Sequence, residues 1–193
     1  MQLRDVAKEL KEKMLKSNSS IGDGCKCGSF VIFGEGCRIG NQVTINNFVQ
    51  IDDGVRIGNN VIIKEFTRID KNAKIGNRVQ IRGHSVICTD AIIEGDNDLG
   101  HGLYLVNHVR MNKYKGDDNV SPPIIKKGVR IGARVMLMPG VIIGNNSIIG
   151  ENSRVRKSIP PNQVWITDDK GEFRFLRKVT KEEALDPHTW SGN

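Results

Sequence analysis

An isoleucine recurs at every sixth residue from Ile39 to Ile93, and this period is the feature that most constrains the fold. A small or β-branched residue precedes each isoleucine by two positions, and Gly, Asn or Asp often follows it, as in Val55–Arg56–Ile57–Gly58. A period of six excludes an α-helix, whose apolar face recurs every 3.6 residues, and it excludes a long alternating strand. The repeating unit is therefore a short strand followed by a corner.

Hexapeptide repeats of this kind are typical of a parallel β-helix, in which each coil stacks on the one before it. The Val and the Ile of one unit are two residues apart, so both point inward. If three units form a triangular coil of about eighteen residues, then Ile39, Ile57 and Ile75 stack in one column with a spacing of roughly 4.7–4.9 Å. The Gly, Asn or Asp after each isoleucine is expected to supply the positive φ of a tight corner.

The limits of this period divide the chain. Residues 3–16 carry apolar side chains at helical spacing and predict an amphipathic helix that covers the edge of the first coil. The period stops after Ile93, resumes at Ile131 and ends at Pro160–Pro161. The sequence therefore predicts three parts: a capping helix within 1–18, a β-helix over 19–162 with an excursion loop at 94–123, and a hairpin (164–179) and tail within 163–193.

Composition narrows the class of ligand. The net charge of +7 and the sequence pI of about 9.3 favour anionic ligands such as phosphorylated cofactors and sugar nucleotides. The basic residues are scattered over outward positions, so no nucleic-acid partner is expected. No apolar run approaches eighteen residues and the N-terminus lacks an apolar signal region, which predicts a cytoplasmic protein without a membrane span. The four cysteines suggest neither a disulfide nor a metal site.

The predicted excursion carries the candidate chemistry, because the core of a β-helix holds no polar groups. It contains two of the four histidines, His101 and His108. Histidine is the side chain best suited to abstract a proton near neutral pH. Either histidine is therefore a candidate general base.

Two segments resemble a known family. The segments LVNHVRMNKY (105–114) and PPIIKKGVRIGARVMLMPGVIIGNNSIIGENSRVRKSIPPN (122–162) are similar to the hexapeptide-repeat acyltransferases, in particular the galactoside, maltose, virginiamycin and polysaccharide O-acetyltransferases. The resemblance covers the whole repeat body. It implies a left-handed parallel β-helix, a homotrimer, and acetyl-CoA bound in a groove between subunits.

The resemblance also assigns roles by position. His108 matches the general base, which deprotonates the acceptor hydroxyl for direct attack on the thioester. Ala133 and Glu151 match positions whose backbone lines the pantetheine groove, and Arg156 and Lys157 match a pair near the nucleotide end of the cofactor. Two adjacent cations suit a pyrophosphate and a 3′-phosphate.

Some positions depart from the family pattern. Arg130 stands where the family usually has Trp, and Ala133 where many members have Ser. The segment 163–167 replaces an A-G-x-P-A stretch, and Trp165 within it is a candidate stacking surface. Sequence spacing does not choose which of four nearby residues orients His108: Asp96, Asp98, Asp117 or Asp118.

The sequence thus predicts an acetyl-CoA-dependent O-acetyltransferase acting on a saccharide or related hydroxyl acceptor, with no metal. N-acylation of an amino sugar nucleotide and a non-catalytic β-helix scaffold are the alternatives. A zinc-dependent carbonic anhydrase of this fold would need three histidine ligands, and no third histidine is well placed beside His101 and His108. An ice-binding β-helix would show outward ranks of threonine, where this chain has Lys, Arg, Asn and Glu.

Overall fold

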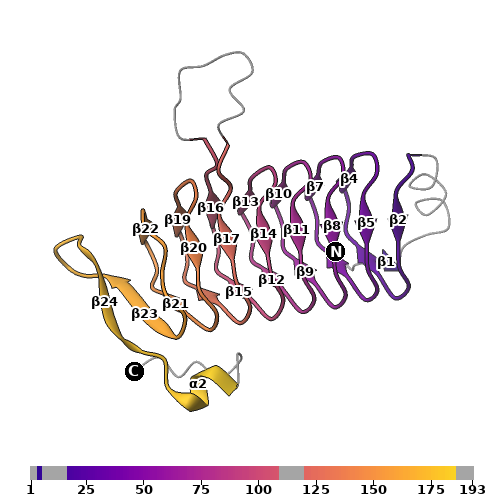
Figure 1. The fold of residues 1–193 in the computed structure, drawn as a ribbon. Coiled ribbons are helices and arrows are strands. Elements are labelled where there is room, and N and C mark those ends of the chain that lie inside the picture. Colours follow the sequence, from indigo (N-terminus) through magenta and orange to yellow (C-terminus); the bar gives the residue numbers. More distant parts are fainter. Residues whose placement is uncertain (1–3, 6–16, 109–119, 186–193) are drawn as a thin grey trace.

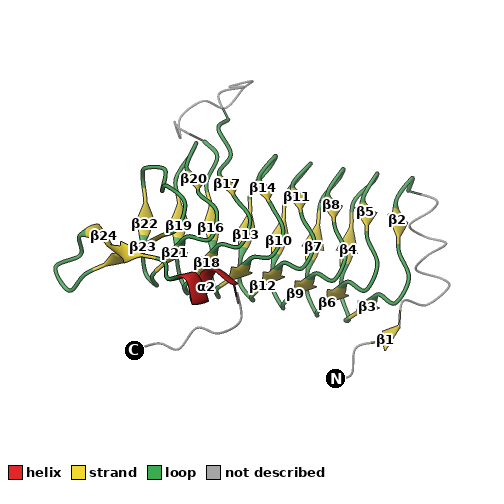
Figure 2. Ribbon diagram, turned by 60° about the horizontal axis from the view of Figure 1, so that its bottom comes forward, coloured by secondary structure: helices red, strands yellow, loops and turns green. Residues whose placement is uncertain are grey.

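A computed structural model describes residues 4–5, 17–108 and 120–185. The chain forms a three-sided prism, and each side is a sheet whose coil strands pair in parallel (Figures 1 and 2). Sheet B contains seven strands: β2 (Ser20–Ile21), β5 (Arg38–Ile39), β8 (Arg56–Ile57), β11 (Lys74–Ile75), β14 (Ile92–Ile93), β17 (Ile124–Ile125) and β20 (Ile142–Ile143). Sheet C contains seven: β4 (Ile32–Phe33), β7 (Gln50–Ile51), β10 (Arg68–Ile69), β13 (Val86–Ile87), β16 (Tyr104–Leu105), β19 (Met136–Leu137) and β22 (Arg154–Val155).

Sheet A has ten strands because both ends of the described chain add to it. They are β1 (Arg4–Asp5), β3 (Lys26–Cys27), β6 (Thr44–Ile45), β9 (Ile62–Ile63), β12 (Gln80–Ile81), β15 (Asp98–Leu99), β18 (Arg130–Ile131), β21 (Ile148–Ile149), β23 (Gln163–Thr167) and β24 (Phe173–Lys178). The short helix α2 (Lys181–Leu185) follows β24.

The coil has three sides and three corners, which we name by the sheets that they join. The chain runs from sheet B to sheet A to sheet C and then into the next coil. Strand β8 pairs in parallel with β11, so that Ile57 lies beside Ile75, eighteen residues further on. This register confirms the predicted coil of three hexapeptides, and the architecture is that of a left-handed β-helix.

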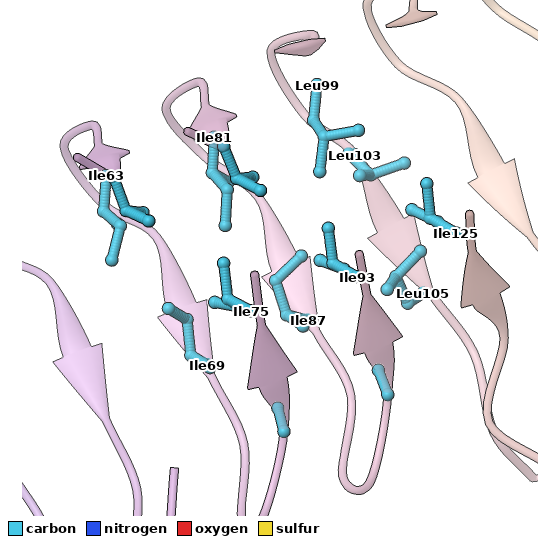
Figure 3. Packing of buried hydrophobic residues seen from close by; sticks show 14 of the residues in the cluster. Ile63, Ile69, Ile75, Ile81, Ile87, Ile93, Leu99, Leu103, Leu105 and Ile125 are labelled. Atoms are coloured by element: carbon cyan, nitrogen blue, oxygen red, sulfur yellow. The ribbon is translucent and has the colours of Figure 1, made fainter. Parts of the chain in front are cut away.

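The core is built from the two inward positions of each unit (Figure 3). Val43 and Ile45 are both fully buried, as are their equivalents in the coils that follow. Each buried isoleucine contributes about 1.5–3 kcal/mol. Columns of stacked isoleucines therefore stabilise a body that has few aromatic residues.

The predicted reason for glycine after the isoleucine is wrong. Positive φ occurs three residues after the isoleucine, as at Gln42 (φ 55°) and Asn60 (φ 56°), and Gly40 is not among the positive-φ residues. A Cβ on Gly40 would lie 2.7 Å from the carbonyl carbon of Gly58 in the next coil. Glycine is required at this position because successive coils stack closely, and not because of its φ.

Asparagine side chains form hydrogen bonds between successive coils at the same corners. The Oδ1 atom of Asn41 accepts a hydrogen bond from the backbone N–H of Asp23, at 2.9 Å. Asn59 does the same for the N–H of Asn41, at 2.8 Å. These bonds satisfy backbone donors that the two-residue strands leave unpaired.

The excursion is shorter than the predicted loop at 94–123. Strands β15 and β16 continue the coil, and Leu99 and Leu105 occupy inward positions with exposures of 0% and 3%. The chain leaves the coil only after these strands, and His108 pairs with Val120 in an antiparallel bridge where it returns. The prediction was wrong here because it followed isoleucine alone, whereas leucine fills the same inward column.

Of the predicted helix at 3–16, only Arg4 and Asp5 are described, and they form a strand. This strand, β1, pairs antiparallel with β3 and so covers the first edge of sheet A. The helix prediction is wrong for these two residues because the free edge of β3 offers backbone hydrogen bonds. The rest of the predicted helix lies outside the described residues.

The predicted hairpin is confirmed. Strand β23 pairs in parallel with β21 and antiparallel with β24. The turn is held by Asp168, whose Oδ1 accepts from the backbone N–H of Lys170 (3.1 Å) and of Glu172 (3.0 Å). Helix α2 lies in the predicted tail, and residues 186–193 of that tail lie outside the described residues.

The four cysteines are free and buried. Burial raises the pKa of Cys27 and of Cys88 to about 12, so both stay as thiols at neutral pH. Within the described ranges, no group of three His, Cys, Asp or Glu side chains is placed to hold a metal ion. The described part of the chain also contains no helix with the length and apolar character needed to cross a bilayer.

Candidate active site

A groove of about 670 Å³ runs over the outer face of sheet A and along the A–C corner. Outward residues of four neighbouring strands and corner residues of the same four coils line it. The lining residues are Gln80, Arg82, Asp98, Gly100, Arg130, Ile131, Gly132, Ala133, Ile148, Ile149, Gly150 and Glu151.

Three glycines keep one side of this groove free of side chains. Gly100, Gly132 and Gly150 take the first position of the A–C corner in successive coils. A Cβ on Gly100 would come within 2.5 Å of the carbonyl carbon of Gly132. The stacking of the coils therefore excludes side chains here, and it leaves a strip of bare backbone against which an extended ligand can lie.

The C-terminal segment borders the groove. Arg130 points outward from sheet A but is only 7% exposed, and its Nη2 donates a hydrogen bond to the backbone carbonyl of Glu183 in α2. Figure 2 shows α2 in red beside the sheet A strands. The residue that replaces the family's tryptophan thus anchors the C-terminal helix.

Glu183 organises this helix. Its carboxylate accepts two hydrogen bonds from Arg177, both at 2.8 Å, and one from the backbone N–H of Thr180 at 2.9 Å. The Thr180 hydroxyl in turn accepts from the N–H of Glu183, which completes a capping box. The Arg177 contacts and the Thr180 N–H lower the pKa of Glu183 to about 2.

The structure brings two of the predicted cofactor residues together. Ala133 and Glu151 occupy equivalent corner positions in successive coils, and both line the groove. Arg156 belongs to the same coil as Glu151 but follows strand β22 of sheet C, and it lines a separate hollow of about 300 Å³ that Asn152 and Thr167 also line.

Lys157 and Trp165 contact each other at the same end. The Lys157 Nζ atom lies 4.5 Å from the centre of the Trp165 ring, and Phe173 stacks on that ring at a centroid distance of 5.3 Å. The indole N–H donates to Gln163 Oε1 at 2.8 Å. Trp165 thus packs within the hairpin and beneath a lysine, and its contact with a nucleotide stays a prediction.

His108 lies where the chain leaves the coil, at the C–B corner. Its Nδ1 is 2.8 Å from Oδ1 of Asn107, which is 7% exposed. The Asn107 amide nitrogen donates to the carbonyl oxygen of Thr89, so its oxygen faces the imidazole. An amide oxygen accepts only, so Nδ1 carries the proton and Nε2 is left as the basic atom.

None of the aspartates considered from sequence fills this orienting role among the described residues. Asp96 pairs with Arg78 and Lys127, which lower its pKa, and Asp98 pairs with Arg82 at 3.3 Å. Asp117 and Asp118 lie outside the described residues. The missed partner, Asn107, is the histidine's neighbour in sequence. The sequence feature that could have indicated Asn107 is its position two residues after the inward Leu105, where several other corners also have Asn or Asp.

One chain does not bring His108 to the groove. The groove covers sheet A, whereas His108 stands at the C–B corner, which is the vertex opposite sheet A in a triangular coil. The two parts therefore lie on opposite sides of the prism. A site that uses both needs a second copy of the chain.

Comparison with known proteins gives two family matches. The model of the GMPPB C-terminal domain matches residues 10–111, just over half of the chain, and the bacterial transferase hexapeptide model (six repeats) matches residues 122–157.

The bifunctional protein GlmU of Legionella pneumophila (strain Corby) is 27% identical over 95 residues, which is 48% of this chain and 19% of GlmU. Galactoside O-acetyltransferase of Escherichia coli (strain K12) is 54% identical over 43 residues, 22% of this chain and 21% of that protein. The chain therefore spans only about a fifth of these relatives.

Solved structures show the same fold. A mutant of the N-acyltransferase AntD from Bacillus cereus, in complex with dTDP-4-amino-4,6-dideoxyglucose and coenzyme A, aligns with a TM-score of 0.57 and 19% identity over 89% of this chain and 90% of AntD. The Arabidopsis UDP-N-acetylglucosamine acyltransferase aligns with a TM-score of 0.59 and 16% identity over 88% and 66% of the two chains. At these identities the likeness is one of fold.

Proposed function

Because this chain belongs to the hexapeptide-repeat acyltransferases, with the GMPPB C-terminal domain family matching over half of it, we propose that it transfers an acyl group from an acyl-coenzyme A thioester to a saccharide. The finer proposal is an acetyl group, a hydroxyl acceptor and His108 as general base. The observation that carries it is the 2.8 Å contact between His108 and Asn107, which fixes the tautomer a base requires.

The groove on sheet A is the proposed donor site. Its strip of corner backbone at Gly132 and Gly150 admits the pantetheine arm between Ala133 and Glu151. At the last coil, Arg156 and Lys157 would bind the phosphates of the nucleotide. AntD, which shares the fold, was solved with coenzyme A bound, and this supports an acyl-CoA donor.

The chemical step is a direct displacement. Nε2 of His108 takes the proton of the acceptor hydroxyl while the oxygen attacks the thioester carbonyl carbon. The carbon–sulfur bond then breaks, and the thiolate recovers the proton from the imidazolium. The products are an ester and coenzyme A with a free thiol, and no other reactant is needed.

We further propose that the active form is a homotrimer, because exposed apolar side chains gather on one side of the prism. Six of them lie on the outer face of sheet C or at the A–C corner: Phe30, Ile32, Phe48, Phe66, Tyr104 and Met136. Phe30, Phe48 and Phe66 stack at centroid distances of 5.0 and 5.1 Å. An apolar surface of this extent marks a contact with another protein surface.

Three copies with sheet C turned toward a common axis would complete the site. In that arrangement the A–C corner of one copy meets the C–B corner of the next. His108 of one copy would then approach the donor groove of its neighbour. The same contact would bury the apolar surface on sheet C.

The experiment compares the wild-type protein with His108→Ala, using acetyl-CoA and a panel of saccharides. We expect the rate of transfer to fall by ~10²–10⁴-fold while donor affinity and the melting temperature are kept. A variant with near-normal transfer would remove His108 from the mechanism and favour the non-catalytic scaffold or another base.

N-acylation is the second candidate function, and the fold shared with AntD, an N-acyltransferase solved in complex with dTDP-4-amino-4,6-dideoxyglucose, favours it. The two reactions are separated by matched pairs of acceptors that differ only in an amine or a hydroxyl at one carbon. Exclusive acylation of the amine would replace the O-acetyltransferase proposal, while His108 would keep its role.

A further inference from the structure

We propose that the acceptor saccharide binds at the A–C corner, on a pair formed by Glu65 and His101 that lies directly beside the donor groove. This inference rests on the proposed function and names the acceptor subsite of that reaction. It is carried by the position of the pair, by the support of Glu65, and by the side chains on either side.

The pair continues the line of the donor groove. Glu65, Gly83, His101, Ala133 and Glu151 take the same corner position in five successive coils. The proposed donor runs from the last coil past Glu151 and Ala133. Its thioester end therefore points toward His101, and Glu65 lies beyond it. An acceptor bound there would present a hydroxyl to the acyl carbon.

Glu65 and His101 lie on either side of a glycine in the same corner column. They are two coils apart, about 9–10 Å between their backbones, and Gly83 lies between them. Gly83 is buried, and Nδ1 of His101 is only 3.7 Å from the place that its Cβ would take.

Glu65 is held in place by a residue of the preceding coil. Nδ2 of Asn46 donates to its Oε1 at 2.5 Å, and Asn46 is itself only 8% exposed. The Oδ1 of Asn46 is buried without a hydrogen-bonding partner among the described residues, which opposes folding. Other coils place Gly28 or Gly100 at this position, so the coil itself does not require an amide. A role in fixing Glu65 accounts for it.

The surroundings suit a sugar ring. The carboxylate of Glu65 stays ionised at neutral pH, because its own backbone N–H and the Asn46 amide lower its pKa. Arg82, which pairs with Asp98, flanks the pair on the groove side. His84 stacks on Phe66 at a centroid distance of 4.9 Å on the other side. Planar charged groups that bind hydroxyls, next to apolar rings, are the elements of a saccharide site.

Glu65 and His101 are thus positioning residues, and the test separates acceptor binding from donor chemistry. Glu65→Gln and His101→Gln keep the size of each side chain. We expect each to raise the KM for the acceptor by about 10- to 100-fold, since a hydrogen bond to a charged group is lost. The KM for acetyl-CoA and its slow hydrolysis by water should not change. Glu35→Gln, the same change at an exposed corner of an early coil, is the matched control and should behave as wild type.

A second readout needs no turnover. Saturation-transfer NMR with methyl galactoside and with UDP-glucosamine as probes should detect binding to the wild type and to Glu35→Gln, and lose it in both pair variants. Binding and acceptor KM that are unchanged in folded Glu65→Gln and His101→Gln would overturn the subsite. Saccharide binding that is lost in the variants, from a wild type that never consumes acetyl-CoA, would support the subsite and overturn the transferase.

Discussion

At the scale of single residues, the proposed chemistry depends on how neighbouring residues orient His108. Asn107 is a neutral partner: its amide oxygen selects the tautomer without stabilising the imidazolium as a carboxylate would. The resemblance to the family motif predicts from sequence that this histidine is the general base. Its partner could not be chosen, because sequence spacing does not show that Asp96 and Asp98 are already engaged by arginines.

Asn107→Asp tests this neutral partner. A carboxylate beside Nδ1 stabilises the protonated imidazole, so the base becomes available only at higher pH. We expect the acid limb of the pH–rate profile to move upward by about one pH unit. Asn107→Ala should lower kcat about tenfold without that movement. Identical profiles for the two variants would show that Asn107 does not contact the base during turnover.

Donor affinity is a second question at this scale. Lys157→Glu places a negative charge where the nucleotide phosphates are proposed to bind. Calorimetric titration with acetyl-CoA should show at least a tenfold loss of affinity, since a charge-assisted contact is replaced by repulsion. Dephospho-CoA distinguishes the 3′-phosphate from the pyrophosphate as the lost contact. Unchanged affinity for both ligands would place the nucleotide elsewhere.

At the scale of elements, the period of six predicted the strands, but the prediction failed where leucine replaces isoleucine at the inward position. Leu99 and Leu105 occupy the inward positions of β15 and β16, so the coil extends into the region predicted as a loop. The corners could not be explained from sequence either. The need for glycine arises from the next coil, eighteen residues away, and a local pattern does not contain that neighbour.

Two glycine substitutions separate these causes. Gly40→Ala drives a Cβ against the backbone of the next coil and should cost about 1–3 kcal/mol of unfolding free energy. Gly36 has φ 66° with nothing within 4 Å of its Cβ position, so Gly36→Asn should be tolerated. Chemical denaturation measures both. Equal losses would contradict the stacking explanation.

Helix α2 should respond to acid through Glu183. The folded pKa of about 2 lies below the ordinary value of 4.5, so its stabilisation is complete above pH 4.5 and is lost as the pH falls toward 2. The protection factors of the α2 amides against hydrogen exchange should fall over that interval. Glu183→Gln should abolish this dependence. A wild-type helix whose protection is constant from pH 5 to pH 2.5 would contradict the assignment.

At the scale of the whole molecule, the surface proposed for assembly could not be predicted from the sequence period. The outward positions follow no readable code, and only the three-dimensional arrangement shows that Phe48 and Tyr104 lie on the side of the prism that separates His108 from the groove corner. If the proposed trimer forms through this side, Phe48→Asp should dissociate it, which sedimentation experiments measure. Arg56→Asp, on the outer face of sheet B, is the matched control and should remain assembled.

The central claim is that each active site is shared between two copies, and subunit complementation tests it most directly. His108→Ala removes the base, and Ala133→Trp fills the donor groove. Each variant alone should be inactive. Co-assembled in equal amounts, they should recover about a quarter of the wild-type activity, because that share of interfaces pairs an intact histidine with an intact groove. Mixed trimers that stay inactive would contradict a shared site.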